Sequence, residues 1–218
     1  MNREEMSVLP QIDEAALEAL RSTLSTTMSE KRYRHTLGVE RMAIRLGALY
    51  CPKRIPELRA AALLHDITKE ETFEKQLQLC EKFGIIIDDL DRLAPKIFHA
   101  RTAAALIPEQ YPQFATPTVV GAVRWHTTGR AGMTLCEHLI YLADYIDDTR
   151  RFEDCVVLRD MFWSADPQCM DERAREAHLW RVLMRSYDMT ICGLLEENAP
   201  ISADTFHARN DILLRVRQ

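Results

Sequence analysis

The stretch AALLHDITKE, which begins at Ala61, places a histidine and an aspartate side by side, His65 and Asp66, and a lysine three residues later, Lys69. The pair follows a run of small apolar residues that is typical of a buried helix. By itself it fits the end of a helix, where a histidine interacts favourably with the helix dipole. It also fits a helix that delivers two neighbouring ligands to a metal ion. Further candidate ligands elsewhere in the chain would favour the second interpretation.

Four more ionisable residues lie in apolar or small-residue surroundings. They are His35 in KRYRHTLGVE, His99 in PKIFHARTAA, His126 in VVGAVRWHTTGR and Asp144 in HLIYLADYIDD. Each has an ordinary alternative, since a histidine can be half-buried in a helix and an aspartate can hydrogen-bond to a neighbouring helix. A carboxylate buried without a partner is costly, however, and a metal ion would remove that cost. Five predicted helices would then each supply one or two ligands, as in bundles that bind metal in their core.

The chemistry of this donor set limits the metal. Imidazole nitrogens and carboxylate oxygens without a thiolate suit iron, manganese, cobalt or zinc, and not a structural zinc site built from cysteines. Six candidate ligands are too many for one tetrahedral zinc and suit two metals that share a bridging carboxylate. We predict Asp66 as the bridge. Two metals so placed could hold a hydroxide between them and stabilise an in-line displacement at phosphorus.

Basic and hydroxyl side chains stand close to these candidate ligands in the sequence. Lys69 lies one helical turn beyond Asp66, and Arg32 lies one turn before the first candidate histidine. Arg130 belongs to a glycine-flanked turn that also contains Thr127. Such side chains can simply be solvated, but together they favour a substrate that contains phosphate.

Other histidines and the cysteines are not needed for this site. His138, His178 and His207 have charged or polar neighbours and are predicted to be ordinary surface or helix residues. The six cysteines are scattered without a C-x-x-C pair, so we expect reduced thiols that lie mostly in the core.

The elements that would position the candidate ligands are all helices. Only seven glycines in 218 residues, together with many Ala, Leu, Glu and Arg residues, predict an all-α protein. No segment alternates with the period of a strand. The sequence predicts helices over residues 13–24, 29–50, 56–67, 69–84, 95–107, 117–128, 135–148 and 171–197, and a short helix after residue 205.

Local signals support several of these boundaries. Asp13 is a candidate N-cap, and Thr134 with Glu137 forms a capping-box pattern. Gly84 and Gly129 are predicted to stop the helices that precede them. The helix over 29–50 is expected to bury one face made of Tyr33, Leu37, Ile44, Gly47 and Ala48.

Length and composition exclude several classes of protein. The chain has a hydrophobic content of 47%, which is enough for a core, and a formal net charge of −5 without a basic block. We therefore expect no binding to nucleic acid, which requires a positive face. Neither a secretory signal at the N-terminus nor a long apolar segment is evident, so we expect a cytoplasmic protein that does not span a membrane. Monomer and homodimer are both open.

The order of the candidate ligands resembles that of the HD-domain phosphohydrolase superfamily. The strings RYRHTLGVE, AALLHDITK, RWHTTGRAGM, IYLADYIDDTR and ADTFHARN look like those of its YqeK-type group, whose members are symmetrical bis(5'-nucleosyl)-tetraphosphatases. The resemblance extends from about Ser29 to Asn210.

This resemblance implies a single all-α HD domain over residues 1–218. Its metal-binding core would span about 29–150, and the helices of 151–218 would pack on it and close the nucleotide pocket. A pair of metal ions, preferentially iron with manganese, cobalt or zinc as alternatives, would be held by His35, His65, Asp66, His99, His126 and Asp144. The substrate would be a small nucleotide, and diadenosine tetraphosphate would be cleaved to two ADP by a metal-bridging hydroxide that attacks a β-phosphate.

The resemblance also implies roles for residues around the metals. Asp66 and Lys69 would be catalytic. The phosphates would be held by Arg32, Lys69, Thr127 and Arg130, and the nucleotide pocket would be lined by Tyr145 and Thr205.

The chain departs from the group at two places. An acidic residue, Asp148, stands where the group usually has proline or glycine, and Ser202-Ala203 replaces its usual His-Pro. Residues 162–175 match nothing in the pattern. Three alternatives stay open: an HD-type phosphohydrolase of another nucleotide, a nucleotide-binding protein that hydrolyses nothing, and a helical protein with histidines packed in its core.

Overall fold

The computed structural model describes residues 12–217, so part of the N-terminal segment considered above for a secretory signal, residues 1–11, lies outside the described range. The described residues form helices and no strand, which confirms the prediction of an all-α protein. The α-helices are α1 (Glu14–Thr27), α2 (Glu30–Tyr50), α3 (Ile55–Leu64), α4 (Phe73–Lys82), α5 (Asp89–Leu93), α6 (Phe98–Gln110), α7 (Pro117–Trp125), α8 (Leu135–Ile146), α9 (Glu153–Trp163), α10 (Glu172–Glu196) and α11 (Ala203–Val216). Three short 3₁₀ helices are η1 (Pro52–Arg54), η2 (Pro95–Ile97) and η3 (Pro112–Phe114). None of these helices combines the length and the apolar character that crossing a membrane requires.

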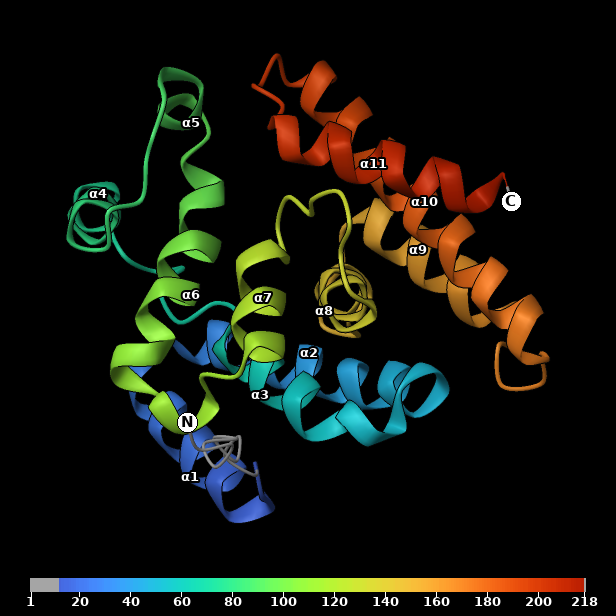
Figure 1. Cartoon of the computed structure of the whole chain (residues 1–218), viewed down its shortest axis with the longest axis horizontal. Helices are drawn as coiled ribbons and strands as arrows, with labels where there is room; N and C mark the ends of the chain where they lie inside the picture. The colour runs from blue at the N-terminus through green and yellow to red at the C-terminus, as the bar shows by residue number, and fades with distance from the viewer. Residues whose placement is uncertain (1–11, 218) are drawn as a thin grey trace, which may run out of the picture.

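Five helices, α2, α3, α6, α7 and α8, form the centre of the molecule and carry the candidate ligands (Figure 1). Helix α2 packs against α3 and α8, and α7 packs against α3, α6 and α8. Helix α1 contacts α2 and α3, and α4 packs on α6. Helix α9 packs on α8 and α10, and α10 pairs with α11. These last three helices lie together on one side, in orange and red.

The predicted capping signals are confirmed. The carboxylate of Asp13 accepts a hydrogen bond from Ala16 N at 2.8 Å. In the capping box of α8, Glu137 N donates to Thr134 Oγ1 at 3.3 Å and Thr134 N donates to the Glu137 carboxylate at 2.7 Å. Gly84, with φ of 63°, follows the last turn of α4. Local sequence therefore determines where these helices begin and end.

Other boundaries differ from the prediction. Helix α3 ends at Leu64, so His65 and Asp66 lie just beyond it, in a segment of turns that continues to residue 70. Helix α4 begins only at Phe73, because the Thr72 side chain caps it. Helices α5 and α9 are absent from the sequence-based prediction, since their acidic first turns and weak periodicity resemble loops. Helix α11 has 14 residues and is longer than the predicted short helix.

The predicted buried face of α2 is only partly correct. Tyr33, Leu37 and Ile44 are only half-buried and Ala48 is exposed, so Gly47 alone of the predicted set is buried. The buried apolar residues of this helix are Val39, Met42, Ala43 and Leu46.

A charged residue on the buried face explains this error. Glu40 is only 4% exposed and belongs to the same face as Ala43 and Gly47. Its carboxylate accepts hydrogen bonds from Arg21 at 2.6 and 2.9 Å and from Arg59 at 2.9 Å. Because both partners come from other helices, the sequence pattern of α2 alone does not reveal that this glutamate is paired and buried.

The three histidines outside the site lie in helices, as predicted, but only His207 is exposed. His178 is buried and donates from Nε2 to Phe162 O at 3.0 Å. His138 is also buried, because the residues from Cys136 to Ala143 are all enclosed by neighbouring helices. Its ring meets Trp180 edge-on at a centroid distance of 5.1 Å, and neither nitrogen has a hydrogen-bond partner within the described chain.

All six cysteines are free thiols: Cys80, Cys136 and Cys155 are buried, Cys51 is half-buried, and Cys169 and Cys192 are exposed.

The turn after α7 packs against the C-terminal helices at a glycine. Gly129 has a φ of 64°, and a Cβ atom there would collide with Tyr187 Oη and lie 2.9 Å from Ala208 Cβ. Tyr187 in turn stacks on Tyr141 of α8 at a centroid distance of 4.6 Å. A glycine is therefore required at this position for both its backbone conformation and its lack of a side chain.

We expect Gly129→Ala to destabilise the protein more than Gly84→Ala. Both substitutions place a Cβ atom on a left-handed residue, which costs about 1 kcal/mol, but Gly84 has open space around it. The clash with Tyr187 should add roughly 1–3 kcal/mol for Gly129→Ala. Urea unfolding of the two variants measures the difference, and equal free energies of unfolding would show that the turn is not held against α10.

We also expect His138 to make stability depend on pH. Burial first, and then the charge of Arg215, lower the pKa of His138 from 6.5 to about 4. The unfolded chain then binds a proton as the pH falls below about 6.5 while the folded chain does not, so the free energy of unfolding decreases toward pH 4. At about pH 5 this effect should reach roughly 2 kcal/mol relative to neutral pH. His138→Leu should remove this part of the decrease in urea unfolding with chelator present, whereas His207→Leu should leave it unchanged.

Candidate metal centre

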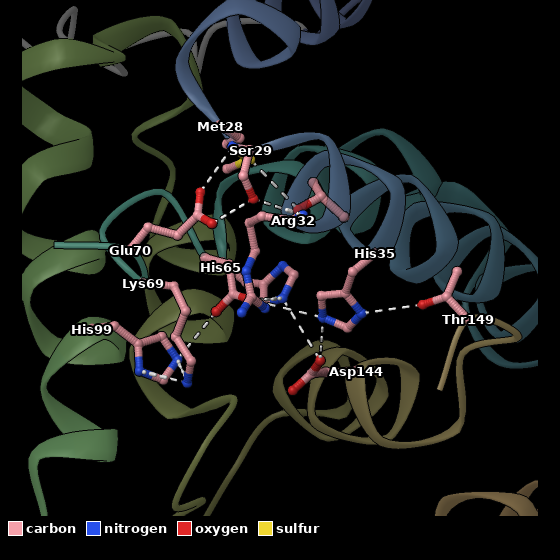
Figure 2. A network of polar contacts seen from close by, with 12 residues as sticks. Met28, Ser29, Arg32, His35, His65, Lys69, Glu70, His99, Asp144 and Thr149 are labelled. Carbon is pink, nitrogen blue, oxygen red and sulfur yellow. Dashed lines mark hydrogen bonds and ion pairs between the residues drawn. The ribbon is translucent and has the colours of Figure 1, made fainter. Parts of the chain in front are cut away.

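The six candidate ligands converge at the centre of the bundle, although they come from three helices and from the residues that directly follow two others. His35 lies within α2 and His99 is the second residue of α6. His65 and Asp66 directly follow α3, and His126 directly follows α7. Asp144 lies in the last turn of α8. The side chains of His35, His65 and Asp144 point toward one another in Figure 2, and His99 lies beside Lys69.

Two overlapping groups have the spacing of metal ligands. In the first, one atom each of His35, His65 and Asp144 lie within 4.8 Å of one another. In the second, the same is true of His65, Asp66 and His126. His99 joins the second group, because its Nε2 is 3.0 Å from His126 Nε2. The predicted ligands therefore share one centre.

Asp66 stands between two pairs of histidines. Its Oδ2 is 3.2 Å from His65 Nε2 and 3.7 Å from His35 Nε2. Its Oδ1 is 3.2 Å from His99 Nε2 and 3.9 Å from His126 Nε2. Each carboxylate oxygen thus faces a different pair of imidazole nitrogens.

The backbone orients three of the four imidazole rings. Nδ1 of His65, of His99 and of His126 each lies 2.7 Å from the carbonyl oxygen of the residue three positions earlier. A carbonyl oxygen only accepts, so Nδ1 carries the proton in each case and Nε2 presents its lone pair to the centre. For His65 and His126, which directly follow α3 and α7, the carbonyl belongs to the last helical turn and has no partner from a continuing helix. The ends of these helices therefore determine the direction of the rings.

The two carboxylates are ionised although they are enclosed. Burial on its own would raise the pKa of Asp66, but the imidazoles of His65 and His99, which stabilise the carboxylate when they carry a second proton, hold it well below its ordinary value. Burial would likewise raise the pKa of Asp144, and Arg150 is the main group that holds it low. Both carboxylates are thus in the form that binds cations.

The histidines differ in their affinity for protons. Burial lowers the pKa of His99, and it lowers that of His126 well below 6.5 with help from the neighbouring histidines. These two rings are neutral, as a metal ligand must be. Burial would also lower the pKa of His35, but hydrogen bonds with Asp144 and Asp147 raise it to about 9. Its Nε2 faces Asp144 Oδ1 at 3.0 Å, where either a proton or a metal cation would be stabilised.

Three basic side chains surround the centre. Arg32 Nη1 lies 2.5 Å from Asp66 Oδ2, Lys69 Nζ lies 3.3 Å from His99 Nε2, and Arg150 Nη2 lies 2.5 Å from Asp144 Oδ1. Lys69 is largely enclosed, and burial lowers its pKa. Arg150 was not among the predicted site residues. The signal that could have revealed it is a basic residue six positions after an aspartate in an apolar helix.

Other predicted substrate-binding residues lie at different distances from the ligands. Thr127 Oγ1 is 3.2 Å from His126 Nε2, so this residue belongs to the centre. Arg130 instead forms an ion pair with Glu137 at 3.0 Å. Tyr145 is half-buried on α8, and Thr205 is buried in the first turn of α11.

A known protein family matches the segment that carries these candidate ligands. Residues 32–149 match the HD domain, and this segment contains all six candidate ligands. The chain belongs to the HD-domain family. The sequence-based predictions of this family and of a hydrolase are thereby confirmed.

Relatives of known name cover most of the chain. The protein named symmetrical bis(5'-nucleosyl)-tetraphosphatase of Bacillus subtilis is 31% identical over 84% of this chain and 90% of its own length. The protein of the same name from Halalkalibacterium halodurans is 31% identical over 86% of this chain and 91% of its own length. A crystal structure of a predicted HD superfamily hydrolase involved in NAD metabolism from Clostridium acetobutylicum superposes with a TM-score of 0.77 and 30% identity. The superposition covers 91% of this chain and 97% of that one.

We expect Asp66→Ala to lose metal. This carboxylate faces both pairs of histidines, so its removal should reduce the metal content of protein purified without chelator to less than roughly a tenth of the wild-type value. Elemental analysis provides the measurement, and circular dichroism verifies that the helices are intact. Asp148→Ala, which alters an exposed aspartate, is the matched control and should keep the full metal content. An unchanged metal content in folded Asp66→Ala would show that Asp66 is not a ligand.

Proposed function

We propose that this protein is a metal-dependent phosphohydrolase that cleaves diadenosine tetraphosphate symmetrically to two ADP. The observation that carries the proposal is the position of Asp66, with one oxygen toward His35 and His65 and the other toward His99 and His126. Support for the substrate comes from the names of the bacterial relatives, which match at about 31% identity.

Two metal ions would fit this donor set, with iron as our first choice and manganese, cobalt or zinc as alternatives. One ion would be held by His35, His65, Asp144 and Asp66, and the other by His99, His126 and Asp66. When bound, such ions act as Lewis acids and lower the pKa of water so that it can attack a phosphoanhydride at neutral pH. The protein contributes the fixed direction of each Nε2 atom and a buried, ionised Asp66.

The basic side chains around the ligands suit a polyphosphate. Arg32 and Arg150 pair with the carboxylates of the centre, so their guanidinium groups are the donors nearest to a phosphate bound there. Lys69 provides a third cation, beside His99, and Thr127 provides a hydroxyl. Arg130 would add a further contact only by leaving Glu137. We propose that Lys69 and Arg150 neutralise the charge that develops on the phosphate oxygens as the bond breaks.

A cavity next to the centre offers a place for a nucleoside. It has a volume of about 220 Å³ and is lined by Lys69, His99, Lys96 and Phe73, among others. The Phe73 ring is 41% exposed and is backed by Phe98, which stacks on it at a centroid distance of 5.9 Å. An exposed ring beside two lysines suits a nucleobase and its phosphates.

The C-terminal helices would close the site from the other side. We propose that Tyr145, at the end of α8, and Thr205, in α11, lie along the second nucleotide. In this proposal residues 151–218 are part of the same domain, because α9 and α10 pack directly on α8.

A second candidate is the same chemistry on another nucleotide. The similar structure from Clostridium acetobutylicum carries a name that refers to NAD metabolism, which favours a dinucleotide with a shorter phosphate chain. A protein that binds nucleotides without hydrolysis is less compatible with a complete set of six donors and ionised carboxylates.

The deciding experiment offers the metal-loaded protein diadenosine tetraphosphate, NAD, GTP and dAMP and separates the products by chromatography. We expect fast hydrolysis of the first compound with ADP as the dominant product, and no hydrolysis by Asp66→Ala. AMP and ATP as the products would contradict symmetrical cleavage. A clear preference for NAD, GTP or dAMP would instead support the second candidate.

A further inference from the structure

The imidazole of His35 is oriented differently from the other three. His65, His99 and His126 each donate from Nδ1 to a backbone carbonyl. His35 lies within the 21-residue helix α2, where nearby carbonyl oxygens already accept the hydrogen bonds of the helix. Its Nδ1 therefore needs a partner from another part of the chain.

The carboxylate of Asp147 lies close to that nitrogen. Asp147 directly follows α8 and is fully buried, and its Oδ2 is 3.3 Å from His35 Nδ1. The other oxygen, Oδ1, accepts hydrogen bonds from the backbone N–H of Thr149, at 2.8 Å, and from its hydroxyl. The Thr149 hydroxyl also lies 3.4 Å from His35 Nδ1, as the dashed line in Figure 2 shows. Since that hydroxyl uses its hydrogen on Asp147, it can only accept from His35.

A glycine on α2 lets this turn approach the helix. A Cβ atom at Gly38 would lie 2.6 Å from Asp147 Oδ1 and 2.7 Å from Thr149 Cγ2. Gly38 comes three residues after His35, so it lies on the same side of the helix, one turn further on. Any side chain at this position would push Asp147 away from the imidazole.

We infer that Asp147 is a positioning residue for His35 and that Gly38 makes room for it. In this inference the negative charge of Asp147, 3.3 Å away, keeps the ring proton on Nδ1, so the Nε2 lone pair points toward Asp144 and Asp66, where a metal ion would bind. This arrangement does for His35 what backbone carbonyls do for the other three histidines. The inference rests on the proposed metal centre and not on the choice of nucleotide.

Asp147→Asn tests the inference with little change in shape. The Thr149 N–H and hydroxyl occupy one oxygen of the side chain, so the asparagine must turn its NH₂ group toward His35. That group donates to Nδ1 and moves the ring proton to Nε2, which then cannot bind a metal. We expect metal affinity to fall by roughly 10–100-fold in chelator competition. In metal-free protein at a pH above the His35 pKa of about 9, where the wild-type ring is neutral, ¹⁵N NMR of labelled histidine should show His35 changing from the Nδ1–H to the Nε2–H form.

Matched variants separate this role from general damage to the fold. Asp148→Asn changes the exposed neighbour and should retain both the affinity and the tautomer of the wild type. Gly38→Ala should weaken metal binding by displacing Asp147, whereas Gly193→Ala, at a helical glycine with open space around it, should not. Gly38→Ala also serves as the test if Asp147→Asn does not fold.

Wild-type metal affinity together with an unchanged His35 tautomer in Asp147→Asn would overturn the inference, and so would wild-type affinity in folded Gly38→Ala. Hydrolysis of diadenosine tetraphosphate is not a readout here. A failure of the proposed substrate would therefore leave these results interpretable.

Discussion

The structure depends on one buried, ionised carboxylate. Asp66 is 4% exposed, and an unpaired charge at such a position would cost several kcal/mol. Four imidazole nitrogens and the Arg32 guanidinium surround its two oxygens, so the bundle core can contain it. Because these partners come from four different helices, the packing of α2, α3, α6 and α7 and the stability of this carboxylate are coupled.

The ends of helices provide much of the required geometry. Helices α3 and α7 both stop directly before a ligand histidine, and in each case the ring donates to a carbonyl of the final turn. A helix that continued through His65 or His126 would use that carbonyl itself and would leave the ring free to rotate. Gly129 has a related role, since it lets the turn after His126 pack closely on α10. The geometry of the centre therefore depends on where the helices end as much as on how they pack.

A balance of charge sets the chemical character of the site. Asp66, Asp144 and Asp147 form an acidic centre, and Arg32, Lys69 and Arg150 form a basic shell next to it. An acidic centre attracts metal cations, and a basic shell attracts phosphate. The net charge of −5 is a sum over the whole chain, so it gives no indication that acidic and basic side chains are separated in this way.

The sequence by itself determined the all-α class, most helix starts and the residue types of the centre. These features depend on neighbours within about one turn, such as the Asp13 cap or the Thr134–Glu137 capping box, or on motifs that stand out locally, such as His65-Asp66. Only the tertiary structure decided which polar residues pair across helices. It buried Glu40 between two arginines, placed Asp147 against His35 and Arg150 against Asp144, and paired Arg130 with Glu137. Most of these contacts depend on how separate helices and turns pack, and the local periodicity of the sequence does not encode that packing.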